Sequence, residues 1–164
     1  MNNTKGLQFR NTFRPGDIGQ IISLHGVIAH GDFGYDCRLE AYVAEHLGRF
    51  AGEDNPKSRI WVVDDNEGIV GTVAIVDAGN DVAQLRWFAV HPRASGKGMG
   101  TALLDKALRF CQRQHYEEVF LWTVEGQEIA RAMYNKNGFE LVEENTHEAW
   151  GKTLTEQKMK LLLA

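Results

Sequence analysis

The chain has 164 residues, 43% of them hydrophobic, so it can bury one substantial core, and we expect a single domain over residues 1–164. The net charge of −4, with basic residues spread along the chain, argues against nucleic acid as the main partner. Two distant cysteines, Cys37 and Cys111, make neither a disulfide framework nor a thiolate metal site. No apolar run approaches the roughly 20 residues that span a bilayer. These features predict a cytoplasmic protein that is not bound to a membrane.

Strands and helices are expected to alternate along the chain, without repeats or a linker. Leu39 to Phe50 has apolar residues at helical spacing, and short apolar runs bounded by Gly, Asn and Asp predict strands. The expected order is a strand at 7–13, a helix from 17, a loop through 31–36, a helix at 39–52, strands at 59–64, 68–77 and 82–90, a helix at 101–115, a strand at 119–123, a helix at 129–137, and antiparallel strands at 139–143 and 155–163.

The stretch from Val90 to Leu104 joins a strand to a helix through a glycine-rich turn. Three residues there can take a positive φ angle and let a ligand approach the backbone: Gly96, Gly98 and Gly100. The first N–H groups of the helix, from about Thr101, lack partners within the helix, and the helix dipole favours an anion at that end. Lys97 and Arg93 add mobile positive charge at the rim. The pattern predicts a phosphate site.

Two common phosphate motifs do not fit this turn. A Walker A loop ends in Gly-Lys-Ser or Gly-Lys-Thr after four intervening residues, whereas here Lys97 lies between two glycines. A Rossmann fingerprint needs a third glycine at a set offset, and Leu103 follows the last pair instead.

The run from Ser95 to Gly100 resembles the acetyl-coenzyme A loop of the GNAT family of N-acetyltransferases. That signature is Gln or Arg, two residues, Gly, one residue, then Gly or Ala, and serine stands here at the first position. Upstream, Leu85 to Pro92 resembles the family's fourth strand with its Val-x-Pro ending. Downstream, Ala130 to Phe139 is similar to the family's Ala-x-x-x-Tyr-x-x-x-Gly-Phe block. With its His-Gly pair at His25, its Gly-Tyr pair at Gly34 and a similar tail through His147 and Trp150-Gly151, the whole chain most resembles a bacterial subgroup that is sometimes fused behind MarR-type regulators.

The resemblance implies an α/β GNAT fold, with a mixed sheet of six to seven strands flanked by about four helices. It also implies direct transfer of an acetyl group from acetyl-coenzyme A to a primary amine of a small molecule or protein. The residues that would bind the cofactor are Phe88, Ala89, Val90, Ser95, Gly96, Lys97, Gly98, Met99, Gly100, Thr101, Gln127 and Tyr134.

Tyr134 matches the tyrosine that in many relatives protonates the leaving thiolate, a task suited to a phenol that stays protonated at neutral pH. The alternative is an ordinary residue of the hydrophobic core. Relatives often use a carboxylate of the fourth strand as the base, but this chain has Gln84 there, and an amide cannot act as a base. The candidate bases are Glu125 or His147, and after them Glu148, His25 and Glu45.

The segment from His25 to Asp36 is rich in glycine and polar aromatic residues for a connection between helices, as binding loops are. His25 and Tyr35 are therefore predicted to contact the acceptor, although stabilisation of the loop by hydrogen bonds is an equally good interpretation. His25 and His30 lack the spacing of a zinc site, and no metal is expected.

Other classes of function stay open at this point. One is a non-catalytic module that binds coenzyme A or acyl-coenzyme A and passes the signal to a partner. Another is a nucleotide-binding protein. The final apolar strand, Met159 to Leu163, can pair within the sheet or across a homodimer.

Overall fold

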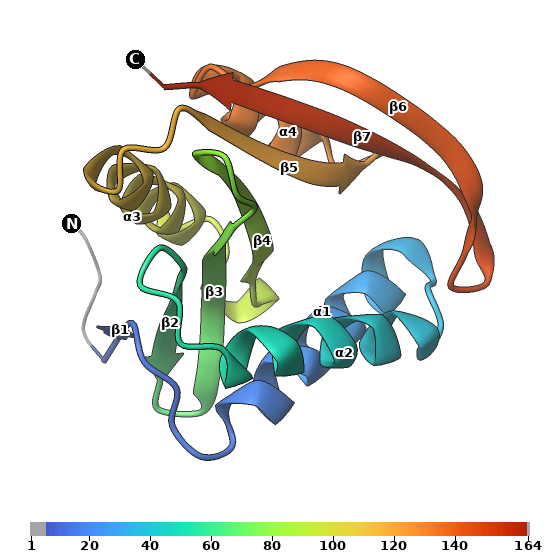
Figure 1. Ribbon diagram of the computed structural model, residues 1–164. Coiled ribbons are helices and arrows are strands. Elements are labelled where there is room, and N and C mark those ends of the chain that lie inside the picture. The colour runs from blue at the N-terminus through green and yellow to red at the C-terminus, as the bar shows by residue number, and fades with distance from the viewer. Residues whose placement is uncertain (1–5, 164) are drawn as a thin grey trace.

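The structure is a computed structural model that describes residues 6–163. Within this range seven strands form one mixed sheet, flanked by four α-helices (Figure 1). The elements in chain order are β1 (Gln8–Arg10), α1 (Asp17–Phe33), α2 (Arg38–Gly52), β2 (Arg59–Asp65), β3 (Gly68–Asp77), β4 (Val82–Val90), the 3₁₀ turn η1 (Pro92–Ala94), α3 (Met99–Arg113), β5 (Glu118–Val124), α4 (Glu128–Lys136), β6 (Glu140–Ala149) and β7 (Lys152–Leu162). The order across the sheet is β1-β2-β3-β4-β5-β7-β6.

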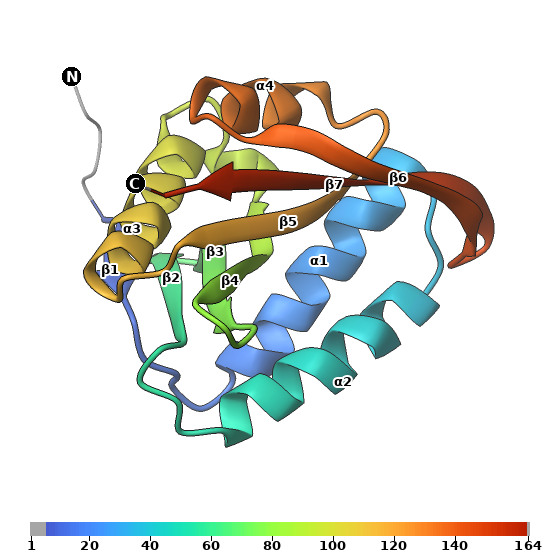
Figure 2. The ribbon, with the colours of Figure 1, turned by 45° about the horizontal axis from the view of Figure 1, so that its top comes forward.

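Two hydrophobic cores lie on opposite faces of the sheet. On one face the apolar stripe of α3 packs over the central strands, and Leu104, Leu108 and Cys111 are buried there as their helical spacing predicts. On the other face α1 and α2 pack against β2, β3 and β4, with Ile21 and Leu47 fully buried. Figure 2 shows α1 and α2 side by side on their face of the sheet. The predicted order of elements, β-α-α-β-β-β-α-β-α-β-β, is confirmed.

The first helix is longer than its sequence suggests. α1 continues to Phe33, so the expected loop from His25 is helical over most of its length. The misleading signal was Gly26, because glycine in a helix interior costs stability relative to alanine. Here the glycine has a packing role: a Cβ at Gly26 would collide with the side chain of Glu40 on α2. The missing side chain therefore lets α1 and α2 approach closely.

The last two strands are also longer than predicted. β6 is exposed along nearly its whole length, so it has no buried face to impose an apolar alternation on the sequence. His147 and Glu148, expected in a loop, lie in this strand. β7 pairs with β5 on one side and β6 on the other, so Met159 lies inside the sheet, and pairing of this strand across a dimer is the wrong alternative.

β4 and β5 open the sheet at its centre. They are the only parallel neighbours in the described sheet, and they pair only from Val82 to Gln84 on β4. Beyond that point the strands diverge (Figure 1). A bulge in the β3–β4 pairing sets Trp87 and Phe88 against a single residue of β3, with Trp87 at φ 46°. A bulge leaves part of a strand's backbone without a ladder partner, and this one lies where the strands separate.

The hairpin of β6 and β7 curves across to the turn between α1 and α2 (Figures 1 and 2). The N–H of Asp36, in that turn, donates a hydrogen bond of 3.0 Å to the carbonyl oxygen of Trp150 at the hairpin tip. The two sides of the opened sheet are thereby joined at the far end.

Candidate functional site

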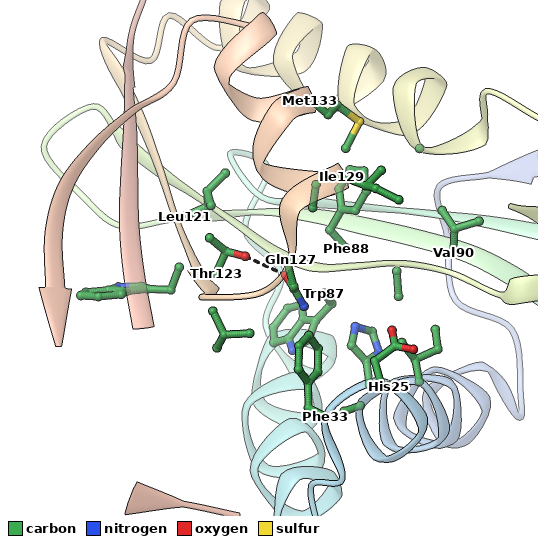
Figure 3. A pocket seen from close by; sticks show the side chains of 18 of the residues that line it. His25, Phe33, Trp87, Phe88, Val90, Leu121, Thr123, Gln127, Ile129 and Met133 are labelled. Atoms are coloured by element: carbon green, nitrogen blue, oxygen red, sulfur yellow. Dashed lines mark hydrogen bonds between the residues drawn. The ribbon is translucent and has the colours of Figure 1, made fainter. Parts of the chain in front are cut away.

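A cleft of about 1170 Å³ occupies the opening between β4 and β5. Its walls come from β4, β5 and β7, from the tip of the β6–β7 hairpin, from α1, α2 and α4, and from the loop before α3 with the first turn of that helix. Figure 3 shows side chains of α1, β4, β5 and α4 converging on this space. Segments distant in the sequence therefore contribute to one site.

One end of the cleft is built from the loop before α3. Gly98 caps the helix at φ 78° and offers no side-chain hydrogen bond to the first turn, so the first N–H groups of the helix are available to a ligand. The helix begins at Met99, two residues before the predicted start. The Met99 side chain is buried in the core, leaving its backbone at the cleft. The predicted cofactor residues of this loop that line the cleft are Ser95, Gly96, Gly98, Met99, Gly100 and Thr101.

Of the two charged side chains predicted at the rim of this loop, Arg93 is held in place by an ion pair. Arg93, expected to be mobile, donates two hydrogen bonds to Asp65, of 2.9 and 3.1 Å. These bonds hold the pKa of Asp65 at about 2. The Ser95 hydroxyl donates to the carbonyl of Pro92 at 2.9 Å, and Lys97 is exposed and outside the cleft lining. The hydrogen-bond donors that this loop offers to the cleft are therefore backbone N–H groups.

Tyr134 lines the cleft from α4. Its ring packs edge-on against Phe88 and Phe139, with centroid distances of 6.3 and 5.8 Å. Burial raises the pKa of this phenol from 10.0 to about 12, so it stays protonated well above neutral pH. Tyr134 therefore brings a hydroxyl group to a part of the cleft wall that is otherwise apolar. Both interpretations of the sequence therefore hold in part, because the ring belongs to the core and the residue lines the site.

Gln127 lies at the N-terminus of α4 and also lines the cleft. The hydroxyl of Thr123 donates a hydrogen bond of 2.6 Å to its side-chain oxygen, drawn as a dashed line in Figure 3. This bond orients the amide so that its NH₂ group remains able to donate to a ligand. Opposite, Phe88, Ala89 and Val90 line the cleft from the bulged end of β4.

His25 lies on α1 at the wall of the cleft (Figure 3). Its Nδ1 is 2.8 Å from the carbonyl oxygen of Ile21, and because a carbonyl can only accept, Nδ1 carries the proton in the neutral ring. Its Nε2 is then an acceptor, and this atom is buried with no hydrogen-bond partner in residues 6–163. Burial lowers the pKa of the ring, which favours the neutral form. A buried lone pair without a partner is a candidate contact for a ligand.

Tyr35 lines the cleft within an aromatic cluster. Its ring stacks on Phe33 and packs against Trp150, each with a centroid distance of 5.3 Å. Burial, and after it the charge of Glu156, raises the pKa of the Tyr35 phenol. The residue joins the α1–α2 turn to the hairpin tip, so it has a packing role as well as a place in the cleft wall.

The two bases named first from the sequence are not in the cleft lining. Glu125 is exposed after β5, and the His147 imidazole is exposed on β6. Glu148 and Glu45 also lie outside it. The carboxylates that do line it were not identified from the sequence: Asp32, Glu128 and Glu156.

Glu156 lies close to His147, one of the two bases named first from the sequence. His147 Nε2 lies 3.2 Å from its carboxylate, across the β6–β7 pair. Glu156 reaches the cleft because β7 pairs with β5 in a register that sets it opposite Val124. Alternation of apolar and polar residues predicts a strand, but it does not predict the register in which that strand pairs with a neighbour. The sequence therefore held no signal that placed Glu156 at the cleft.

Within residues 6–163, no cluster of three or more His, Cys, Asp or Glu side chains is arranged to hold a metal ion. Among the helices in that range, none has the length and apolar character required to cross a membrane.

Residues 29–139 match the model of the Acetyltransferase (GNAT) family. The chain belongs to this family. Curated relatives include N-acetyltransferase 8B of Homo sapiens, 29% identical over 100 residues, which cover 58% of this chain and 44% of the relative. The N-acetylaspartate synthetase of Xenopus tropicalis is 34% identical over 88 residues, 53% of this chain and 32% of the relative. The chain thus spans less than half the length of these curated relatives.

Solved structures share the GNAT fold over nearly the whole chain. A GCN5-related N-acetyltransferase from Kribbella flavida aligns with a TM-score of 0.75 at 21% identity, covering 98% of this chain and 100% of that one. The Salmonella typhimurium protein YncA, solved with its cofactor acetyl-CoA, aligns with a TM-score of 0.71 at 18% identity, covering 97% and 95%. The predicted fold class, with seven strands and four α-helices in the described range, is confirmed.

Proposed function

We propose that the protein transfers an acetyl group from acetyl-coenzyme A directly to a primary amine of a small molecule or protein. The observation that carries the proposal is the meeting, in one cleft, of a helix N-terminus without a side-chain cap and a buried phenol. Membership of the GNAT family supports the same conclusion.

The residues at the donor end fit this co-substrate. Positive φ at Gly96 and Gly98, with open space where a Cβ would stand, allows a pyrophosphate to reach the N–H groups of the α3 terminus. The unpaired backbone of the β4 bulge and the Gln127 amide can hydrogen bond the pantetheine arm. The thioester supplies an activated acetyl group. Alignment of donor and acceptor removes much of the entropic barrier to a bimolecular step.

In the transfer the amine nitrogen bonds to the carbonyl carbon as the carbon–sulfur bond breaks. The departing sulfur takes a proton from the Tyr134 hydroxyl, and the attacking amine gives up a proton. We assign this second proton to His25 Nε2, because that lone pair is at the cleft wall and has no partner in the described chain. Glu125 and His147 lose priority as bases because neither lines the cleft.

The test of this function is the release of free thiol from acetyl-coenzyme A in the presence of a panel of primary amines. Thiol release that requires both protein and amine supports the transferase. Tight binding of acetyl-coenzyme A without thiol release for any amine contradicts it and favours the non-catalytic binding module. Tight binding of ATP or NAD without coenzyme A binding favours a nucleotide-binding protein instead.

Our proposals on domain organisation, cellular location, subgroup and assembly rest on the sequence alone. We propose a single cytoplasmic domain, close to the acetyltransferase part of MarR-fused proteins, that forms a homodimer. Because β7 is enclosed by its neighbours, sheet pairing between copies has only β1 and β6 available as edges in the described range. Sedimentation equilibrium measures the oligomeric state, and a monomer at all concentrations contradicts the dimer.

A further inference from the structure

Arg86 lines the acceptor side of the cleft from β4, close to the point where β4 and β5 separate. Its guanidinium carbon lies 4.7 Å from the centroid of the Trp87 ring and 6.0 Å from that of Tyr42 on α2. One of its Nη atoms donates a hydrogen bond of 3.3 Å to the Tyr42 hydroxyl. Two aromatic rings and one hydrogen bond therefore restrain the side chain before any ligand arrives.

The charge of Arg86 is not neutralised by the protein. Within residues 6–163 no carboxylate oxygen lies within 4.0 Å of its guanidinium, whereas Arg10 and Arg93 each bond to acidic side chains. Among the described residues that line the cleft, Arg86 is also the only lysine or arginine. The acceptor side thus presents one permanent, uncompensated positive charge to whatever binds there.

The shape of the group indicates the kind of anion. A guanidinium has five N–H donors in its plane, and stacking on ring faces leaves that plane's edge open. Tyr42 uses a single donor, so two parallel donors remain for a carboxylate, which guanidinium binds in bidentate fashion. Among the described residues, the cleft lining also holds three acidic side chains, Asp32, Glu128 and Glu156. These acids would repel a phosphate dianion and attract an ammonium group.

We propose that the acceptor is an amine that also carries a carboxylate, as amino acids do, and that Arg86 binds this carboxylate. The proposal rests on the acetyl transfer described above and narrows its acceptor to one chemical class. The amine end of such a molecule then faces the side of the cleft that bears His25 and the acidic residues. The cleft's single arginine and its several acids match the two ends of a zwitterion.

The experiment compares acceptors in pairs that differ only by the carboxylate: tyrosine with tyramine, and methionine with 3-(methylthio)propylamine. For the natural sequence we expect kcat/KM for the better carboxylate-bearing member to exceed that of its partner by about 10- to 100-fold, the range of a charge-assisted hydrogen-bonded pair. Arg86→Gln removes this preference. Arg86→Lys, which keeps the charge but loses the planar fork, retains a smaller part of it.

Arg59→Gln is the matched control. Arg59 also lies over an aromatic ring, with its guanidinium carbon 4.8 Å from the Phe110 centroid, but it is outside the cleft lining. This variant should keep the full preference for the carboxylate. Thermal unfolding of each variant checks that the fold is intact.

Equal or better use of the decarboxylated amines by the natural sequence overturns the proposal, as does a preference that survives Arg86→Gln. Preference for phosphoethanolamine over every amino acid overturns it in favour of a phosphate. If no amine releases thiol, acetyl transfer itself fails. Calorimetric binding of the same pairs then decides the Arg86 assignment separately, and weaker binding of the carboxylate members to Arg86→Gln supports it.

Discussion

The two ends of the cleft are built in different ways. The donor end comes from two short segments, the loop around Gly98 and the start of α4 with Gln127 and Tyr134, and the proposal assigns it mainly backbone N–H groups with these two side chains. The acceptor end is assembled from α1, α2, β4 and the β6–β7 hairpin, and the roles that we propose there belong to side chains such as His25 and Arg86. A site made of backbone is tied to a local motif, whereas a site made of side chains depends on tertiary packing.

The largest expected effect is at the donor end. Tyr134→Phe removes the proton donor and should lower kcat by about 10²- to 10⁴-fold, while the Kd for acetyl-coenzyme A, measured by calorimetry, changes little. Because the pKa of Tyr134 is raised from 10.0 to about 12, its ionisation should cause no loss of kcat as the pH rises through 10.

Tyr116→Phe is the control for this change. Tyr116 is equally buried, and its hydroxyl donates to the Lys57 carbonyl at 2.6 Å outside the cleft. The variant should lose stability and keep its kcat. Equal losses of kcat in both variants would assign Tyr134 to packing alone.

The second largest effect is expected at the acceptor end. His25→Gln should reduce kcat for alkylamine acceptors by roughly 100-fold, a typical contribution of a general base. Hydroxylamine, which is neutral at the assay pH, needs no such base for its first deprotonation, so the rate with this acceptor should fall far less. Steady-state thiol release with both nucleophiles measures the difference.

His46→Gln is a closely matched control, because His46 Nδ1 lies 2.8 Å from the Tyr42 carbonyl in the same helical i−4 arrangement. It is outside the cleft lining. This variant should behave as the natural sequence does. A loss at His25 that is the same for both nucleophiles would rule out the role of base.

A smaller effect concerns the backbone of the donor end. Gly98→Ala places a Cβ at φ 78°, which costs an L residue about 1–2 kcal/mol, and should weaken acetyl-coenzyme A binding by about 10-fold. Gly48→Ala, inside α2 with open space around the new methyl group, should instead stabilise the protein by about 0.5–1 kcal/mol without changing that Kd. Calorimetry and urea unfolding provide the two readouts. Unchanged affinity in Gly98→Ala would contradict a backbone-built anion site.

The smallest effect concerns the ion pair beside the loop. The folded-state pKa of Asp65, about 2, lies below the ordinary value of 3.8, so the pair with Arg93 contributes stability above about pH 4 and loses it as the pH falls towards 2. Asp65→Asn should flatten the pH dependence of the free energy of unfolding in that window. Because Arg93 is outside the cleft, acetyl-coenzyme A affinity should stay within about twofold. A large change in affinity would give Arg93 a direct part in binding.

The difference between the two ends of the cleft also explains which parts of the site could be predicted from the sequence. Gly98 and Tyr134 lie in short sequence motifs, so the residues of the donor end could be proposed from the sequence. The order of strands and helices could also be predicted in this way. The glycines near His25 predict a loop, whereas the structure has a helix there. Gly26 is explained by tertiary packing, because the Glu40 side chain of α2 lies where its Cβ would be. Arg86 reaches the cleft because β4 and β5 separate, and Glu156 reaches it through the register of β7 on β5. The periodicity of side chains along a strand predicts neither arrangement.

The most direct test of this two-ended site is a crystal structure with acetyl-coenzyme A bound. The account predicts the pyrophosphate on the N–H groups at Gly98 to Thr101, the thioester sulfur within hydrogen-bond distance of the Tyr134 hydroxyl, and the acetyl carbonyl carbon open towards His25 and Arg86. A pyrophosphate bound elsewhere, or a sulfur out of reach of Tyr134, would contradict it.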